Sequence, residues 1–329
     1  MAAARRARPL RVRRAPAPVV VHTAPLVLPV SAEPLRDGAV AVRGDRVLLM
    51  GPRSGVLASC PGAAERRWPG MIVAGLVDAC PDAAAPGPGV TARARVPADA
   101  PDPSRLPGVS YVEVTGEDER AWEERGRDAV ITAIREVDRP CPVGLAARTH
   151  DPHVLEDVAV LARTFGLRLL ADLDSHATAE LDEAGVLGPH AHVTCSRPLD
   201  PGERKLLRLR GTAVALRGPW AAADALPLLE EGNAVAFAGD PLAGAVAIKD
   251  DVRARRLRVR GLDRRLVEAA TAGGAAALGM RHGPGRSGVL EPGSRADFAV
   301  FDARGRYPYA ALLARPTVLG TVVGGVLDR

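Results

Sequence analysis

Aromatic residues and lysines are scarce in this 329-residue chain, and both shortages bear on its partners. Aromatics make up 3% of the residues and the only lysines are Lys205 and Lys249, so the net charge of +5 comes from arginines scattered along the sequence. A nucleic-acid-binding surface needs basic residues clustered together with aromatic ones. The chain is therefore not expected to bind nucleic acid.

Cysteines and long apolar runs are also few. The four cysteines, at 60, 80, 141 and 195, form no C-x-x-C pair and no disulfide framework. No apolar run reaches the roughly 18 to 20 residues that a membrane span needs. The sequence thus predicts a cytoplasmic protein with reduced thiols and no membrane partner. Residues 1–17, which are rich in arginine, are expected to form a disordered basic tail.

The rest of the chain alternates between strand and helix patterns. Strands are predicted over 18–30 and 39–51 with a turn at 36–38, and the Gly44-Asp45 signal predicts a tight hairpin within the second segment. Helices are predicted over 115–137 (capped by Thr115), 151–166, 200–211, 222–232 and 263–280, and short apolar strands lie between several of them. This alternation predicts an α/β fold with a parallel sheet, of which an eight-stranded barrel is one form. The strand-rich segments 288–305 and 317–329 predict a small β domain built from both ends of the chain.

Several motifs resemble one family. The segment GVLEPGSRADFAVFD (288–302) resembles the GxLxPGxxADxxxxD signature of the amidohydrolase superfamily, and DGAVAVRGDRVLLMGP (37–52) is similar to its opening segment. Phrases such as YVEVTGEDERAWEERGR and DRRLVEAATAGGAAALG are similar to imidazolonepropionase-like and aminofutalosine-deaminase-like hydrolases of actinobacteria. The resemblance implies a (β/α) TIM-type barrel over 73–283, beside a composite β-sandwich domain from 18–72 and 284–329.

This barrel is expected to be shortened. Cys80 and Asp240, which the resemblance places after the first and last barrel strands, are 160 residues apart. Seven βα units of roughly 30 residues each would need on the order of 210 residues. The shortage falls between Cys80 and Val143, which predicts one or two truncated units there.

The resemblance also implies a chemistry and a set of site positions. Family members hydrolyse non-peptide C–N bonds with zinc or another divalent metal, which His-x-His, two further histidines and an aspartate hold. Where the family has PGLVNAHTH this chain has AGLVDACPD, and only the last aspartate of the set is retained. A serine, Ser175, stands where the family's proton-shuttling glutamate is expected. The metal positions that result are Cys80, Asp82, Asp172, Cys195 and Asp240, and Asp240 is also the predicted catalytic residue.

Two hypotheses follow from the lost histidines. The first is a protein without hydrolytic activity, or with impaired activity, that serves as a binding protein or partner subunit for a nucleoside-like or cyclic-amide ligand, and that could form a homo-oligomer. The alternative is an active C–N hydrolase or deaminase with zinc in a re-specified Cys/Asp site. Soft thiolates, the rigid Pro81 and the missing glutamate favour the first hypothesis. His190 and His192 have ligand-like spacing, but the family pattern places them at a strand entry, away from the catalytic end.

Overall fold

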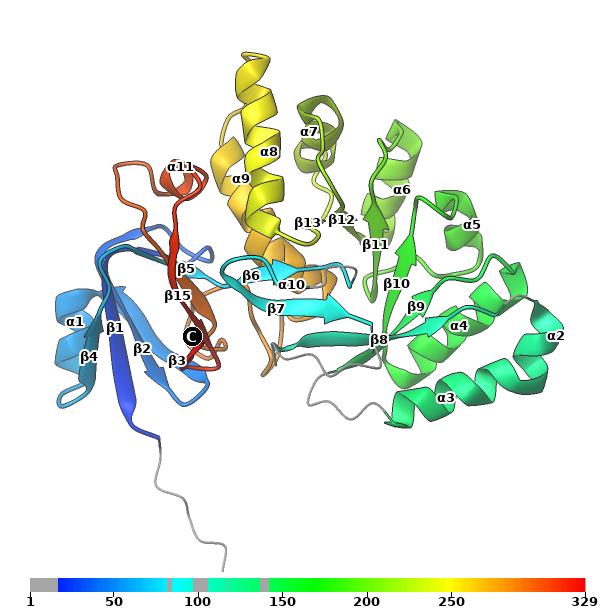
Figure 1. Cartoon of the computed structure of the whole chain (residues 1–329), viewed down its shortest axis with the longest axis horizontal. Coiled ribbons are helices and arrows are strands. Elements are labelled where there is room, and N and C mark those ends of the chain that lie inside the picture. Colours follow the sequence, from blue (N-terminus) through cyan, green and yellow to red (C-terminus); the bar gives the residue numbers. More distant parts are fainter. Residues whose placement is uncertain (1–16, 82–84, 97–105, 117, 137–141, 329) are drawn as a thin grey trace, which may run out of the picture.

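Two sheets organise the chain, and each draws on different parts of the sequence (Figure 1). The computed structural model describes residues 17–81, 85–96, 106–116, 118–136 and 142–328. One sheet is parallel and has eight strands in sequence order, and the other is mixed and combines strands from both ends of the chain. The predicted α/β architecture with a TIM-type barrel is confirmed.

The parallel sheet forms a nearly closed barrel. Its strands are β6 (Leu76–Asp78), β7 (Val90–Arg95), β8 (Gly108–Val114), β9 (Val143–Ala147), β10 (Arg168–Asp172), β11 (Ala191–Cys195), β12 (Ala213–Leu216) and β13 (Val235–Phe237). Closure occurs at the carboxyl ends of the first and last strands, where the Ala79 amide donates a hydrogen bond to the Phe237 carbonyl at 3.1 Å.

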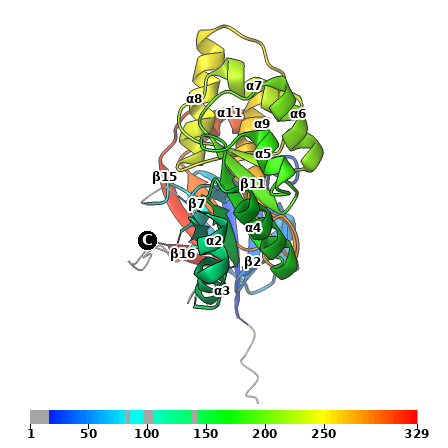
Figure 2. The same ribbon diagram turned by 90° about the vertical axis from the view of Figure 1, so that its right-hand side faces the viewer.

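Helices follow the strands on the outer side of the barrel (Figures 1 and 2). Their bounds are α2 (Glu119–Ala121), η1 (Trp122–Gly126), α3 (Arg127–Glu136), α4 (Pro152–Phe165), α5 (Thr178–Glu183), α6 (Pro201–Arg210), α7 (Ala222–Glu230), α8 (Pro241–Ala254), α9 (Leu262–Glu268), η2 (Ala269–Gly273) and α10 (Gly274–Ala277).

Local sequence explains several helix ends. Asp200 and Glu203 form a capping box at the start of α6, and Gly211 closes that helix with a left-handed backbone. The helix predicted over 115–137 begins later than expected, with α2 at Glu119. Asp118, and not Thr115, is its cap, because the Asp118 carboxylate accepts a hydrogen bond from the Ala121 amide at 2.7 Å.

The shortening lies in the connections of the barrel and not in its strands. All eight strands are present, but the described parts of the β6–β7 and β7–β8 connections contain no helix. Strands β14 and β15 of the mixed sheet lie against β7 instead. A Cβ atom at Gly89 would lie 2.9 Å from the Phe301 ring, so the two sheets approach closely here. The mixed sheet therefore covers the part of the barrel where the described segments of these two connections contain no helix.

The mixed sheet has the order β16-β15-β14-β5-β1-β2-β3, with β4 also paired to β1. Its elements are β1 (Val19–Leu28), β2 (Leu35–Arg43), β3 (Arg46–Pro52), β4 (Ala64–Arg67), β5 (Met71–Ala74), β14 (Phe298–Phe301), β15 (Val318–Val323) and β16 (Val326–Asp328), with helices α1 (Arg53–Ser59) and α11 (Pro308–Leu312). The turn predicted at 36–38 is wrong. These residues lie within β2, and Gly38 pairs with Ala24 because its missing Cβ leaves room for the Val27 side chain.

Segments η2 and α10 contact both strands that border the opening of the barrel. A Cβ atom at Gly273 would lie 2.1 Å from the Val235 carbonyl oxygen, and one at Gly274 would lie 2.4 Å from that of Val77. Below the hydrogen bond that joins β6 to β13, this helical segment thus packs directly on the backbones of both strands. The glycine pair of AGGAAALG serves this close packing.

Within the described ranges, no helix is both long and apolar enough to span a bilayer.

Candidate active site at the barrel mouth

The inward-facing residues at the carboxyl ends of the strands form a charged mouth. Leu170 and Ala146 pack in the interior cluster of the barrel, whereas Leu169 and Ala171 belong to the outer core. Because side chains alternate along a strand, Asp172 points inward two residues after Leu170. The same spacing places Glu113, Arg148 and Arg217 on the inner side of their strands.

Arginine side chains neutralise the carboxylate of Asp172. Arg217 Nη2 lies 2.9 Å from Asp172 Oδ2, and Arg148 Nη1 lies 3.8 Å from the same oxygen. The Arg148 guanidinium also contacts Glu113 at 3.1 Å. Asp172 is 5% exposed, so its carboxylate is shielded from solvent, whereas the Arg217 side chain is 31% exposed. The residue predicted to replace the family's strand-5 histidine, Asp172, thus has a guanidinium as its counterion.

Asp174 extends this network. Its carboxylate contacts Arg217 Nη2 at 2.5 Å and accepts a hydrogen bond from the Ser196 hydroxyl at 2.6 Å. Partial burial by itself raises the pKa of Asp174, but the Ser196 hydrogen bonds and the Arg217 charge outweigh it and hold that pKa below its ordinary value. Asp174 is therefore a carboxylate near neutral pH, and both of its strong partners are already in place.

Two predicted metal positions follow strand β6. Cys80 is 2% exposed, and its amide donates to the Asp78 carboxylate at 3.0 Å. The same carboxylate accepts a hydrogen bond from the Gly239 amide at 2.7 Å, which ties the end of β6 to the segment before Asp240. The other predicted position, Asp82, lies outside the described residues.

Cys195 is on the outer side of its strand. Its side chain belongs to the outer core with Val193, and its Sγ donates to the Arg197 carbonyl at 3.0 Å. Burial raises the pKa of the thiol to about 11, so it stays protonated near neutral pH, whereas metals bind the thiolate. The sequence AHVTC could have indicated this outward orientation. Side chains two residues apart lie on the same face of a strand, so Cys195 faces the same side as the apolar Ala191 and Val193.

Asp240 caps a helix. Its Oδ1 accepts a hydrogen bond from the Ala243 amide at 3.0 Å at the start of α8. This contact uses one of the two carboxylate oxygens. The metal and catalytic assignments of Asp240 remain predictions.

The potential metal-binding side chains do not gather at one place. Among the residues that the structure describes, no three His, Cys, Asp or Glu side chains lie close enough together to hold a metal ion. Three described members of the predicted set have other roles: Asp172 is in an ion pair, the Cys195 thiol faces the outer core, and Asp240 caps a helix. The described donors thus do not fit the zinc centre that the resemblance implies. The five residues as a ligand set remain a prediction, since Asp82 is not described.

Sequence reasoning did not anticipate the arginines of this network. Arg217 ends the strand phrase TAVALR and Arg148 ends VGLAAR, so each stands where an apolar strand gives way to a charge. A charged residue at the carboxyl end of a barrel strand is a signal for the site, and it would have found both.

Below the mouth, His192 crosses the interior of the barrel. Its Nε2 lies 2.9 Å from the Ala79 carbonyl oxygen and its Nδ1 lies 3.4 Å from the Tyr111 hydroxyl. The carbonyl can only accept, so Nε2 carries the proton of the neutral ring. Burial, with the nearby Arg168 charge, lowers the pKa of His192 to about 3. This histidine therefore fills the barrel core as a neutral group.

The buried histidines predict an acid-sensitive fold. Burial also lowers the pKa of His22 to about 4, with Arg66 adding to the effect. Both residues titrate near 6.5 when unfolded, so the unfolded chain binds more protons as the pH falls below 6.5. Stability should therefore be full above pH 6.5 and should fall toward pH 4, by up to about 1.4 kcal/mol per pH unit for each histidine.

Melting temperatures measured from pH 7.5 to 4.5 test this expectation. The dependence should become shallower in His192→Gln, and it should be unchanged in His153→Gln, whose residue is exposed. Equal pH dependence in all three proteins would contradict it.

Comparisons with known proteins support the fold. No protein-family model and no curated protein sequence matches the chain. Among solved structures, an adenosine deaminase from Xanthomonas campestris with bound zinc is similar with a TM-score of 0.75 and 17% identity, over 95% of this chain and 93% of that one. Aminofutalosine deaminase from Helicobacter pylori gives 0.75 and 14%, over 94% and 100%. That enzyme is also known in complex with methylthio-coformycin.

Atrazine chlorohydrolase from Arthrobacter aurescens, complexed with zinc and atraton, gives a TM-score of 0.67 and 17% identity, over 94% of both chains. These likenesses cover nearly the whole chain, and at such identities they show a shared fold. The chain is thus structurally similar to members of the amidohydrolase superfamily.

Proposed function

We propose that this chain is a non-hydrolytic relative of the deaminase-like amidohydrolases, and that its barrel mouth binds a small nucleoside-like or cyclic-amide molecule without a metal. The observation that carries the proposal is the ion pair between Asp172 and Arg217. In this pair Arg217, a residue of the chain itself, is the cation that faces the Asp172 carboxylate.

A guanidinium cannot replace the metal in hydrolysis. The family reaction requires a cation that binds water and lowers its pKa until hydroxide forms near neutral pH. Arg217 carries a delocalised charge with hydrogen-bond donors only, and it has no coordination position for water. Its Nη2 is already shared between two carboxylates, Asp172 and Asp174. This pairing supports a mouth that is electrostatically complete without a metal.

Proton transfer also lacks its expected group. Ser175 occupies the position of the family's glutamate, and a serine hydroxyl is not a general base near neutral pH. The neighbouring His176 is 3% exposed, with its ring nitrogens 2.7 Å from the Thr149 carbonyl oxygen and 3.1 Å from that of Asp172. Both contacts are to backbone acceptors, so this histidine holds the mouth loops together. These features support a binding role.

The ligand class follows from the resemblance and from the mouth itself. The similar solved structures include an adenosine deaminase, and an aminofutalosine deaminase bound to methylthio-coformycin. At the mouth of this chain, Arg148 and Ser196 add polar groups to the two paired aspartates. Such groups match the hydrogen-bonding edges of a purine-like ring.

One feature favours the alternative, a zinc-dependent C–N hydrolase. The ends of β6 and β13 are joined by two hydrogen bonds, to the Phe237 carbonyl and to the Asp78 carboxylate. Cys80 and Asp240 therefore follow neighbouring strand ends, and Asp82 belongs to the same region of the sequence. If the alternative is correct, these residues hold a zinc ion, and measuring the zinc content of the protein tests this.

Metal content is the direct test. Protein purified without chelator is expected to contain far less than one zinc per chain, and the content should be the same in Cys80→Ser and Asp240→Asn. The purified protein should release no ammonia from adenosine, with or without added zinc. Adenosine or methylthio-coformycin should nevertheless raise its melting temperature, because a ligand that binds only the folded state stabilises it.

Zinc at one ion per chain that is lost in both variants would overturn the proposal and establish the alternative. Metal-free protein whose melting temperature responds to neither ligand would overturn the assigned ligand class. Arg208→Gln, an exposed change on α6, serves as the control for effects of charge alone.

A further inference from the structure

The segment that joins α8 to α9 concentrates positive charge. Seven of the thirteen residues from 253 to 265 are arginines, and Asp263 is the only acid among them. Like charges gathered on a surface raise the local potential and attract a partner of opposite charge. The surrounding structure decides which of these guanidinium groups remain for such a partner.

The acidic side chains around this segment are already paired with other basic residues. The pairs are Asp251 with Arg255 at 2.9 Å, Asp250 with Arg315 at 3.2 Å, Asp263 with Lys249 at 3.1 Å, and Glu33 and Glu268 with Arg264 at 3.0 and 2.8 Å. Arg253, Arg258 and Arg260 are exposed, and their side chains make no ion pair or hydrogen bond within the described part of the chain. Three guanidinium charges are therefore left without a counterion.

These three arginines line one groove of about 940 Å³ between the α8–α9 segment and α11. Helix α11 contacts α9, and Figure 1 shows it beside α8 and α9. Apolar groups line the same groove. Val252 and Leu262 are buried, whereas Leu257 is 44% exposed and Tyr307 is 69% exposed. The groove thus combines unpaired cations with apolar surface that is open to a partner.

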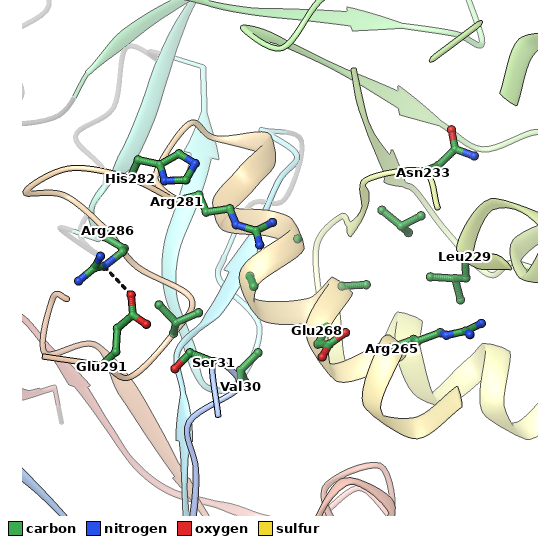
Figure 3. Close-up of a pocket in the computed structure, with 15 residues that line it drawn as sticks. Val30, Ser31, Leu229, Asn233, Arg265, Glu268, Arg281, His282, Arg286 and Glu291 are labelled. Atoms are coloured by element: carbon green, nitrogen blue, oxygen red, sulfur yellow. Dashed lines mark ion pairs between the residues drawn. The ribbon is translucent and has the colours of Figure 1, made fainter. Parts of the chain in front are cut away.

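The last arginine of the run lies at a different place. Figure 3 shows Arg265 beside Glu268 at a separate cavity, which Ser31 and Asn233 also line. Its neighbour Arg264 lines the groove, but its charge is neutralised by two glutamates. The unpaired charge of the groove therefore comes from the segment before α9.

The backbone of this segment also has free donors. Helix α8 ends with Arg256 in a left-handed conformation (φ 56°), and the Leu257 amide donates to the Val252 carbonyl at 3.0 Å. Beyond this turn, the amides of residues 258–260 donate to no described group, and these residues belong to neither a helix nor a strand. A peptide that lies along such a segment can accept hydrogen bonds from it, as in the addition of a strand.

We infer that this groove is a docking site for an extended acidic segment of a partner protein. The acidic side chains of the partner pair with the three unpaired guanidinium groups, and its apolar side chains enter the groove beside Leu257 and Tyr307. The free amides of 258–260 favour a peptide over a lipid surface or a nucleic acid, because its backbone carbonyls match them. The groove lies at the carboxyl end of α8 and the mouth at its start, so the inference does not depend on the function proposed for the mouth.

Titration of the full chain with a fluorescent peptide tests this inference. The probe is a short peptide in which glutamate alternates with leucine and serine, and the comparison peptide has lysine in place of each glutamate. The acidic peptide should bind more tightly, and its binding should slow hydrogen exchange of the amides at 258–260. Vesicles that contain phosphatidylserine and a single-stranded oligothymidylate are the other probes. Tighter binding of either one than of the acidic peptide would overturn the assigned partner.

Charge-reversal variants locate the binding site. Arg258→Glu and Arg260→Glu should each weaken binding of the acidic peptide by about tenfold. Arg208→Glu is the matched control, an exposed position on α6, and it should change the affinity by less than about twofold. The inference fails if the acidic peptide binds no better than the lysine peptide, if the three variants weaken binding equally, or if the amides at 258–260 gain no protection.

Discussion

Replacing Gly274 with alanine is expected to lower the free energy of unfolding by about 3 kcal/mol or more, through overpacking. The added methyl group would lie 2.4 Å from the Val77 carbonyl oxygen and 2.8 Å from the Val77 Cβ. The carbonyl belongs to the backbone of β6, and this strand borders the opening of the barrel, so relief requires the helix and the strand to separate. The loss in the free energy of unfolding should therefore come from weaker packing of α10 on β6, where the barrel closes.

Helix propensity acts in the opposite direction and decides how the experiment is read. Gly274 has helical angles, φ −60° and ψ −42°, so alanine by itself would stabilise the helix by about 1 kcal/mol. The steric conflict must outweigh this gain. Gly55 in α1 is the matched control, because a Cβ atom there meets no atom within 4 Å.

Chemical denaturation of the three proteins measures both effects. Gly55→Ala should be as stable as the natural chain or more stable, and Gly274→Ala should be much less stable. If Gly274→Ala were as stable as Gly55→Ala, α10 would not pack on β6 as described.

Replacing Asp297 with alanine is expected to cost about 3 to 4 kcal/mol, because it removes one partner of a buried ion pair. The side chain of Asp297 is fully buried, and its carboxylate contacts Arg295 Nε at 2.7 Å, the Gly324 amide at 2.7 Å and the Ser287 hydroxyl at 3.2 Å. Its backbone carbonyl also accepts a hydrogen bond from the Gly75 amide at 3.1 Å. One residue thus joins the turn of the last hairpin to the start of β14.

The second aspartate of the same motif provides the control. Asp302 has a side chain that is 55% exposed, and its nearest cation, Arg304, lies 3.9 Å away. Asp302→Ala should therefore change stability by less than about 0.5 kcal/mol. Comparable losses in Asp297→Ala and Asp302→Ala would contradict the assigned role of Asp297.

A double variant tests the cause of the loss. Asp297→Leu combined with Arg295→Met removes both charges, and it should be more stable than Asp297→Leu alone, which leaves the Arg295 cation without its main partner. Additive losses would mean that packing and the hydrogen bond to Gly324, and not the buried charge, dominate.

Local patterns in the sequence determined much of the architecture. The helices over 151–166 and 200–211 were predicted nearly to the residue, because a capping aspartate precedes each and a glycine with a left-handed backbone ends it. The alternation of helix and strand predicted the parallel sheet. The motif at 288–302 predicted the β14 segment that pairs with the strands from the N-terminal end. The sequence also revealed that the histidines of the expected metal centre are missing.

Other features were decided only by the tertiary structure. Arg217 lies 45 residues from Asp172 in the chain, and no local pattern indicates that a guanidinium will meet this carboxylate. The described parts of the first two barrel connections contain no helix, and the mixed sheet lies against β7 there, which no local sequence pattern indicates. Val30 and Ser31, which follow β1, line one cavity together with Leu229 and Asn233 from a distant part of the chain. The physical reason is that periods of 2 and 3.6 residues record which face of an element is buried, whereas barrel closure fixes which distant residues face one another.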